Sequence, residues 1–302
     1  AQGIPGNGGA QAELFQKRLG VRQFLACQVG YLHSRRPGTD DEVHRGRQRY
    51  GGSCSRRGGH YLPARRTILT RGYVSNLQPG LLERLSAETP GLEWLRILYA
   101  YPQDVSERLI EAMARLSQVV HYVDLPLQHA HPSVLRRMRR PADVDRVRRL
   151  LGDLRGAMPD IALRTTFIVG FPGETEEEFA ALLEFMEEVR FDRVGVFAYS
   201  QETGTPAAEM ADQVPAEVVA ERYERAMVLQ QGISLERNEE QVGRVLRVLL
   251  EGSGEGLTVG RSYRDAPEID GLVLIPEERE PQGFADVRIT SAQEYDLVGE
   301  IV

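Results

Sequence analysis

The sequence is poor in cysteine and has no long apolar run. Its 302 residues include two Cys, too few for a disulfide-stapled scaffold. No stretch approaches the roughly 20 apolar residues of a transmembrane helix, and the first residues lack the apolar region of a signal peptide. Hydrophobic residues make up 41% of the chain and charged residues 27%, as in ordinary globular proteins. We therefore expect a cytoplasmic protein with no membrane contact.

Charge is distributed unevenly along the chain. Residues 1–75 carry 13 Lys and Arg against 4 Asp and Glu, residues 76–237 carry 18 against 26, and residues 238–302 carry 6 against 14. The first block also holds 13 of the 30 Gly and both Cys. A charge step of this size predicts a boundary near residue 75. Taken alone, the Gly- and Arg-rich first block is typical of a disordered basic arm that binds nucleic acid.

Apolar runs alternate with helical patterns from residue 92 onward. We predict helices over 105–116, 132–139, 143–157 and 175–189, and strands over 94–100, 119–127, 161–169 and 193–199. Strands that alternate with helices of this length indicate parallel β/α units. Residues 76–237 are thus predicted to form an α/β domain with about four parallel strands. A long helix over 215–238, with Tyr223 and Ile233 in its apolar pattern, ends the domain.

The pattern changes to short strands after residue 238. Gly, Pro and charged residues separate five short apolar runs, at 245–250, 257–259, 272–275, 287–289 and 297–302. Five short strands in so few residues predict a small closed β-barrel. Residues 238–302 are therefore expected to be a second domain.

Several polar residues lie where a buried sheet should be apolar. They follow or interrupt two predicted strands, namely Asp124, Gln128 and His129 in the first case and Arg164, Thr165 and Thr166 in the second. In a β/α barrel such positions often reach a ligand at the carboxyl-terminal face, although a single His is more often a core or loop residue. Thr175 and Glu178 have the spacing of a capping box, which indicates the start of a helix rather than a site.

Short blocks of sequence occur in a characteristic order between residue 77 and the C-terminus. They are Leu98–Pro102, Tyr122–Ala130, Arg136–Pro141, Leu163–Glu174, Arg193–Ser200 and Gly204–Ala208. Together they resemble the methylthiotransferases of the radical S-adenosylmethionine superfamily. A further block, Gly260-Arg-Ser-Tyr-Arg-Asp-Ala-Pro-Glu-Ile-Asp-Gly271, resembles the branch of this family that modifies a small-subunit ribosomal protein, number twelve.

The resemblance implies a fold, cofactors and an activity. It implies an incomplete radical S-adenosylmethionine β/α barrel followed by a TRAM-like β-barrel. The family uses S-adenosylmethionine and two 4Fe-4S clusters to add a methylthio group to the β-carbon of an aspartate in the ribosomal protein. The implied cofactor-binding residues are Gln128, Arg164, Thr165, Thr166, Ile168, Phe197 and Tyr199.

The cysteines depart from the family pattern. The family holds its barrel cluster with a Cys-x3-Cys-x2-Cys motif, whereas Cys27 and Cys54 are the only thiols of this chain. We therefore assign no metal ligand and no catalytic residue, and we expect the chain as written to be inactive. Residues 1–75 are interpreted as an out-of-frame translation, because codons for Arg65-Arg-Thr-Ile-Leu69 read one base earlier can encode Ala-Gln-Asp-Asn-Thr, close to a family motif. Sequencing the gene tests this hypothesis.

The acidic C-terminal block predicts the kind of partner. Its 14 carboxylates oppose six Arg and no Lys, a balance that repels phosphate and suits a basic ribosomal protein, so we expect no direct RNA binding. Asp265, Glu268 and Asp270 are the candidate substrate contacts, with a solvated loop as the equal alternative. Two other functions stay open, a tRNA methylthiotransferase of the sister family and a ribosomal-protein-binding module without a cluster.

Overall fold

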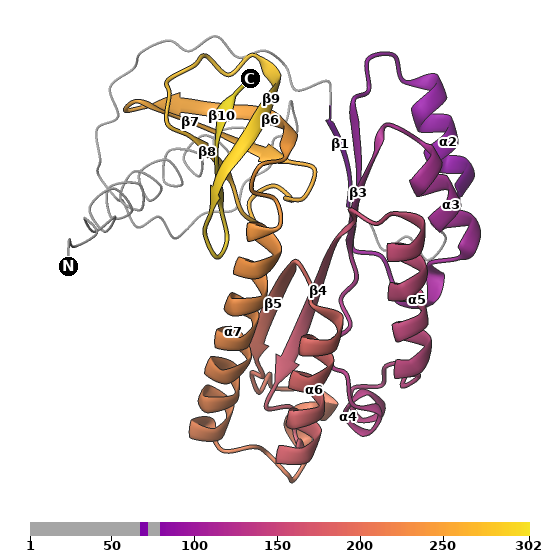
Figure 1. The fold of residues 1–302 in the computed structure, drawn as a ribbon. Coiled ribbons are helices and arrows are strands. Elements are labelled where there is room, and N and C mark those ends of the chain that lie inside the picture. Colours follow the sequence, from indigo (N-terminus) through magenta and orange to yellow (C-terminus); the bar gives the residue numbers. More distant parts are fainter. Residues whose placement is uncertain (1–66, 72–78) are drawn as a thin grey trace, which may run out of the picture.

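The computed structural model describes residues 67–71 and 79–302, which form a sheet domain and a small barrel joined by one long helix (Figure 1). Residues 1–66 and 72–78 lie outside the described residues. They include both Cys and most of the first block, for which a disordered or out-of-frame segment is predicted. Within the described ranges, no helix combines the length and apolar character needed to cross a membrane.

The sheet is parallel, and its strands follow one another in chain order. They are β1 (Thr67–Arg71), β2 (Trp94–Leu98), β3 (Val119–Asp124), β4 (Ala162–Val169) and β5 (Arg193–Ala198). The last four confirm the predicted α/β class, whereas β1 is a fifth strand from a segment that showed no recognisable pattern. A run of five residues among Gly and Arg is too short for periodicity, so only its pairing with β2 identifies β1 as a strand.

Helices cover one face of this sheet. They are α2 (Pro79–Glu88), α3 (Glu107–Arg115), α4 (Pro132–Arg137), α5 (Val144–Ala157) and α6 (Glu176–Val189), with short 3-10 turns η1 (Pro102–Asp104) and η2 (Pro206–Glu209). The capping box predicted from sequence is present. Thr175 accepts a hydrogen bond from the Glu178 N–H, and the Glu178 side chain accepts one from the Thr175 N–H. Apolar side chains such as Leu95, Val123 and Phe167 fill the space under the helices.

The barrel packs on the other face of the sheet. Trp94, Tyr122 and Ala162 lie on this face and form a buried cluster with Ala266 of the barrel. The Trp94 ring meets Phe284 edge-on, with centroids 4.7 Å apart. The barrel therefore covers the amino-terminal half of this face, and no helix of the described ranges covers the carboxyl-terminal half.

The long helix α7 (Ala216–Glu239) runs along β5 and ends at the base of the barrel (Figure 1). Its buried face is largely polar and includes Arg222, Gln230, Ser234 and Asn238. Gln230 donates to the Phe191 carbonyl at 2.9 Å, and Ser234 donates to the Asp192 carbonyl at 3.2 Å. Tyr223, which the predicted apolar pattern includes, is instead 40% exposed. The helix is thus held by hydrogen bonds to the backbone before β5 as well as by apolar contact.

The C-terminal unit is a closed five-stranded barrel, as predicted. Its strands are β6 (Val245–Gly254), β7 (Leu257–Ser262), β8 (Val273–Ile275), β9 (Gly283–Ala292) and β10 (Leu297–Ile301). Neighbours pair in the order β10-β8-β7-β6-β9, and β10 closes the ring by pairing with β9. Alternating residues such as Leu246, Val248 and Val287 fill the interior.

Candidate functional site

Four of the predicted cofactor-binding residues share one face of the sheet. Arg164, Thr166 and Ile168 alternate along β4 and are half-buried, and Ile168 is in register with Phe197 of β5. Phe197 is 57% exposed. We call this region, between the barrel and the carboxyl ends of β3, β4 and β5, the open face. The carboxyl-terminal edge of parallel strands is where β/α proteins place their ligands.

Gln128 and Tyr199 lie at the carboxyl-terminal edge of the open face. Gln128 adopts a positive φ of 72°, donates its N–H to the Thr166 carbonyl at 2.8 Å, and accepts from the Ile168 N–H at 2.8 Å. These bonds extend β3 alongside β4. Tyr199 follows β5 and meets the Phe171 ring edge-on. Its buried hydroxyl has no hydrogen-bond partner within residues 79–302.

Thr165 lies on the opposite, helix-covered face. Its side chain is fully buried, donates to the Leu125 carbonyl at 2.7 Å and accepts from the Leu127 N–H at 3.3 Å. The strand alternation that places Arg164 and Thr166 on the open face forces Thr165 away from it. Thr165 therefore orients the chain after β3 and does not share the open face with the other predicted residues.

Arg164 forms an ion pair at each end of its guanidinium group. Nη1 donates to Asp124 Oδ2 at 2.8 Å, and Nε donates to Asp270 Oδ1 at 3.3 Å. Burial alone would lower the pKa of Arg164, but the two carboxylates outweigh burial and raise it. Burial raises the pKa of Asp124, and its second oxygen, Oδ1, is buried with no hydrogen-bond partner among the described residues.

Two of the three candidate substrate contacts are buried in the joint between sheet and barrel. Asp265 is 1% exposed and accepts from Arg193 at 2.9 Å and from Ser262 Oγ at 2.7 Å. The Asp270 side chain is 2% exposed and is held by Arg164. Both carboxylates pair with arginines of the sheet, so they cannot reach a partner protein from this position. Glu268 alone of the three is exposed.

A third buried carboxylate lies at the same joint. Asp192 Oδ1 accepts from Arg264 of the barrel at 2.7 Å and from Arg237 of α7 at 3.3 Å, and Oδ2 accepts from the Leu163 N–H at 3.0 Å. Burial would raise the pKa of Asp192, but Arg264 and Arg237 outweigh burial and lower it. Asp192 thus stays ionised and links strand, helix and barrel.

Glu174 is buried and ends the family-like block Leu163–Glu174, but the sequence alone indicates no role for it. Both of its carboxylate oxygens accept from the Gly170 N–H at 3.1 Å, and one accepts from Arg222 of α7 at 2.8 Å. His129 Nε2 lies 3.4 Å from the other oxygen. The pairing fixes the turn that follows β4. The sequence signal for this residue is the run Pro172-Gly173-Glu174. The capping box that follows at Thr175 and Glu178 accounts for the helix start but not for Glu174.

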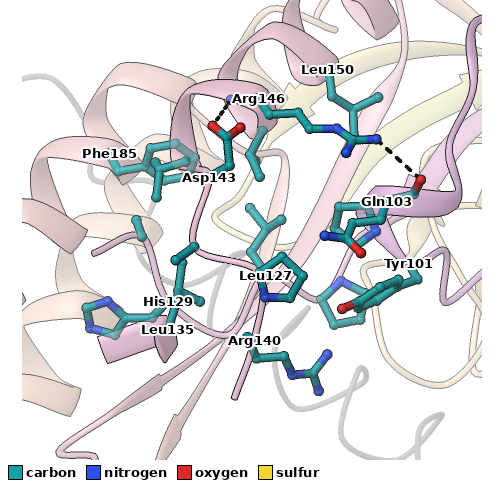
Figure 2. A pocket seen from close by; sticks show the side chains of 17 residues that line it. Tyr101, Gln103, Leu127, His129, Leu135, Arg140, Asp143, Arg146, Leu150 and Phe185 are labelled. Atoms are coloured by element: carbon teal, nitrogen blue, oxygen red, sulfur yellow. Dashed lines mark hydrogen bonds between the residues drawn. The ribbon is translucent and has the colours of Figure 1, made fainter. Parts of the chain in front are cut away.

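A cavity of about 310 Å³ lies at the carboxyl ends of β2 and β3, next to the start of α5 (Figure 2). Arg146 donates its N–H to Asp143 at 2.9 Å and a guanidinium N–H to the Gln103 carbonyl at 3.5 Å. Arg140 also lines the cavity, whereas none of the seven predicted cofactor-binding residues does. No group of three or more His, Cys, Asp or Glu within the described ranges could hold a metal ion.

Comparisons with known proteins match both units. Residues 65–186 match the model of the Radical SAM superfamily, and residues 242–302 match that of the TRAM domain. The chain is 60% identical over 227 residues to the ribosomal protein uS12 methylthiotransferase RimO of Roseiflexus sp. (strain RS-1), covering 74% of this chain and 48% of the relative.

Proteins of the same description in two other bacteria are also similar. The Chloroflexus aurantiacus protein is 54% identical over 73% of this chain and 50% of its own length. The Pelotomaculum thermopropionicum protein is 50% identical over 76% of this chain and 53% of its own length. The chain thus spans about half the length of the curated relatives it matches.

Asp192→Asn is expected to destabilise the protein by about 3–5 kcal/mol near pH 7, because it leaves Arg264 buried without a full counter-charge. The depressed pKa of Asp192 means that its contribution is complete above about pH 4, the ordinary range of Asp, and is lost as pH falls through the folded-state value. Urea unfolding between pH 3 and 7 measures both effects. The difference between wild type and variant should shrink below about pH 4, and a difference that stays constant to pH 3 contradicts the prediction.

Proposed function

Because the chain belongs to the radical S-adenosylmethionine methylthiotransferases, we propose that it contributes the barrel and TRAM units of an enzyme that modifies ribosomal protein uS12. The proposed reaction adds a methylthio group to the β-carbon of an aspartate of that protein. The observation that carries the proposal is the 60% identity over 227 residues to a uS12 methylthiotransferase, over a region with matches to both domain models. A ribosomal substrate places the reaction in the cytoplasm.

The open face has a chemistry that suits S-adenosylmethionine. Two buried polar atoms lack hydrogen-bond partners among the described residues, Asp124 Oδ1 and the Tyr199 hydroxyl, and a bound ligand rich in hydroxyl and amino groups would satisfy them. Ile168 and Phe197 offer apolar surface for a purine ring. In the family, S-adenosylmethionine supplies the radical chemistry; the residues of this chain would bind it and hold it against β4 and β5.

The donor set for an iron–sulfur cluster does not fit. A cluster of this family needs three closely spaced thiolates, and the chain has Cys27 and Cys54. We therefore derive no electron-transfer step from these residues, and we propose that the 302-residue chain by itself has no radical activity.

The acidic barrel supports a basic protein substrate over RNA. Residues 238–302 carry 14 carboxylates and six Arg, and Glu268 is exposed on the segment that resembles the ribosomal-protein branch of the family. A tRNA substrate, as in the sister family, would meet repulsion at this surface. Because the chain has two Cys, a second candidate function is favoured. This is a module that binds the ribosomal protein and catalyses no reaction.

Phe197→Ala is expected to weaken S-adenosylmethionine binding to the full chain by about 1–3 kcal/mol, the range found for stacking of a base on an aromatic ring. Phe197 is 57% exposed, so its truncation should leave stability nearly unchanged. Val228→Ala on α7, where Val228 is 63% exposed, removes a similarly exposed apolar side chain and should leave binding unchanged. Equilibrium dialysis measures the three affinities. Equal affinity for wild type and Phe197→Ala would exclude the open face as the cofactor site.

Anaerobic reconstitution of the full chain with iron and sulfide should yield negligible bound iron, because two thiolates cannot replace a three-Cys motif. Iron and acid-labile sulfide assays on the desalted protein provide the measurement. A matched Cys27→Ser, Cys54→Ser double variant gives the background. About four irons per chain above that background would contradict the proposal of an inactive chain.

Glu268→Lys is expected to lower the affinity for isolated uS12 more than Glu255→Lys, which makes the same charge change at another exposed position of the barrel. Fluorescence titration with labelled uS12 at two salt concentrations measures this, because an electrostatic contact weakens as salt rises. Competition by tRNA as strong as by unlabelled uS12 would instead favour the sister activity.

A further inference from the structure

The C-terminal barrel contacts Arg164 of the open face through the carboxylate of Asp270. Asp270 lies between β7 and β8, and its side chain is 2% exposed. Oδ1 accepts from Arg164 Nε at 3.3 Å, and Oδ2 accepts from the Tyr122 hydroxyl at 2.8 Å and the Ala266 N–H at 2.9 Å. Asp270 is therefore fixed by its own barrel and by the sheet, and it holds Arg164 from the side of the barrel.

Arg164 presents its remaining nitrogen to the open face. Nε is bound by Asp270 and Nη1 by Asp124, whereas Nη2 has no hydrogen-bond partner among the described residues. Nη2 lies above Gly195, where an added Cβ would be 3.6 Å from Nη2 and 3.7 Å from Thr166 Oγ1. A larger residue than Gly would fill the space in front of this donor. The Arg164 side chain is 14% exposed, which leaves room for a ligand contact.

Asp124 supplies an acceptor next to this donor. Only its Oδ2 is used by Arg164, and Oδ1 is buried with no hydrogen-bond partner in the described ranges. An isolated Arg–carboxylate pair prefers the bidentate arrangement, in which two guanidinium N–H groups bind both carboxylate oxygens. Asp270 prevents this arrangement by holding Nε on the opposite side. The donor Nη2 and the buried acceptor Oδ1 therefore both remain without hydrogen-bond partners among the described residues, next to the open face.

From this geometry we infer that Asp270 is a positioning residue through which the C-terminal barrel prepares the open face for its ligand. It keeps Arg164 and Asp124 from closing on each other, so that one offers a donor and the other an acceptor to a polar, hydroxyl-bearing ligand. The inference rests on the proposed function for the identity of that ligand, S-adenosylmethionine. The contact between Asp270 and Arg164 stands on the structure alone.

The test compares Asp270→Asn with Asp265→Asn in the full chain. Both variants neutralise a buried carboxylate of the same segment, and Asp265 pairs with Arg193 instead of Arg164. Both should lower the melting temperature. Only Asp270→Asn should weaken S-adenosylmethionine binding, by about tenfold for the loss of one charged hydrogen bond. Asp270→Glu, which keeps the charge, should recover part of the affinity.

A second readout does not require the cofactor. In protein with 15N-labelled arginine, the Arg164 Nε–H signal, assigned with Arg164→Lys, should exchange slowly with solvent in wild type and Asp265→Asn and faster in Asp270→Asn. Equal exchange in all three proteins, or faster exchange with unchanged cofactor affinity, overturns the inference. If wild type binds no S-adenosylmethionine, the proposed function fails, and the exchange rates still decide whether Asp270 fixes Arg164.

Discussion

Buried arginine–aspartate pairing at the joint between sheet and barrel is the constraint on which the arrangement of this protein depends. Asp192 pairs with Arg264, Asp265 with Arg193, and Asp270 with Arg164. Each pair crosses from one unit to the other, and each carboxylate is almost fully buried. An unpaired buried charge is far more costly than a paired one. Moving the barrel would separate several of these pairs at once and is therefore unfavourable. The pairs therefore fix the barrel in one position on the sheet.

That position makes the barrel a wall of the open face. The barrel covers the amino-terminal half of the uncovered face through apolar contacts such as Trp94 with Phe284. No helix or strand of the described residues covers the carboxyl-terminal half, and there Thr166, Ile168 and Phe197 lie side by side across β4 and β5. One of the carboxylates that attach the barrel, Asp270, also orients the guanidinium of Arg164 on the open face. Domain attachment and preparation of the site are thus one interaction.

The sequence predicts a helix or strand correctly where periodicity and turn residues within the element itself specify it. The four strands β2 to β5, the capping box at Thr175 and the five strands of the barrel all lie where periodicity and turn residues indicated. Prediction failed where a distant partner decides. Strand β1 exists through its pairing with β2, and the buried face of α7 is polar because it binds backbone carbonyls near β5. Thr165 and Thr166 look equivalent in sequence, yet strand alternation places them on opposite faces.

From residue 92 onward the sequence by itself determined the order of strands and helices, and it also determined the acidity of the barrel and the motifs that resemble a known family. Only the tertiary structure decided which polar residues lie on the open face and which form buried pairs that hold the two units together. The acidic block predicts Asp265 and Asp270 as partner contacts beside Glu268, but the arginines with which they pair, Arg193 and Arg164, lie 72 and 106 positions away in the chain. A charge at the surface and a charge in a buried pair have the same local sequence signal. What separates them is the free energy of burial, which depends on contacts that form only when the two units meet.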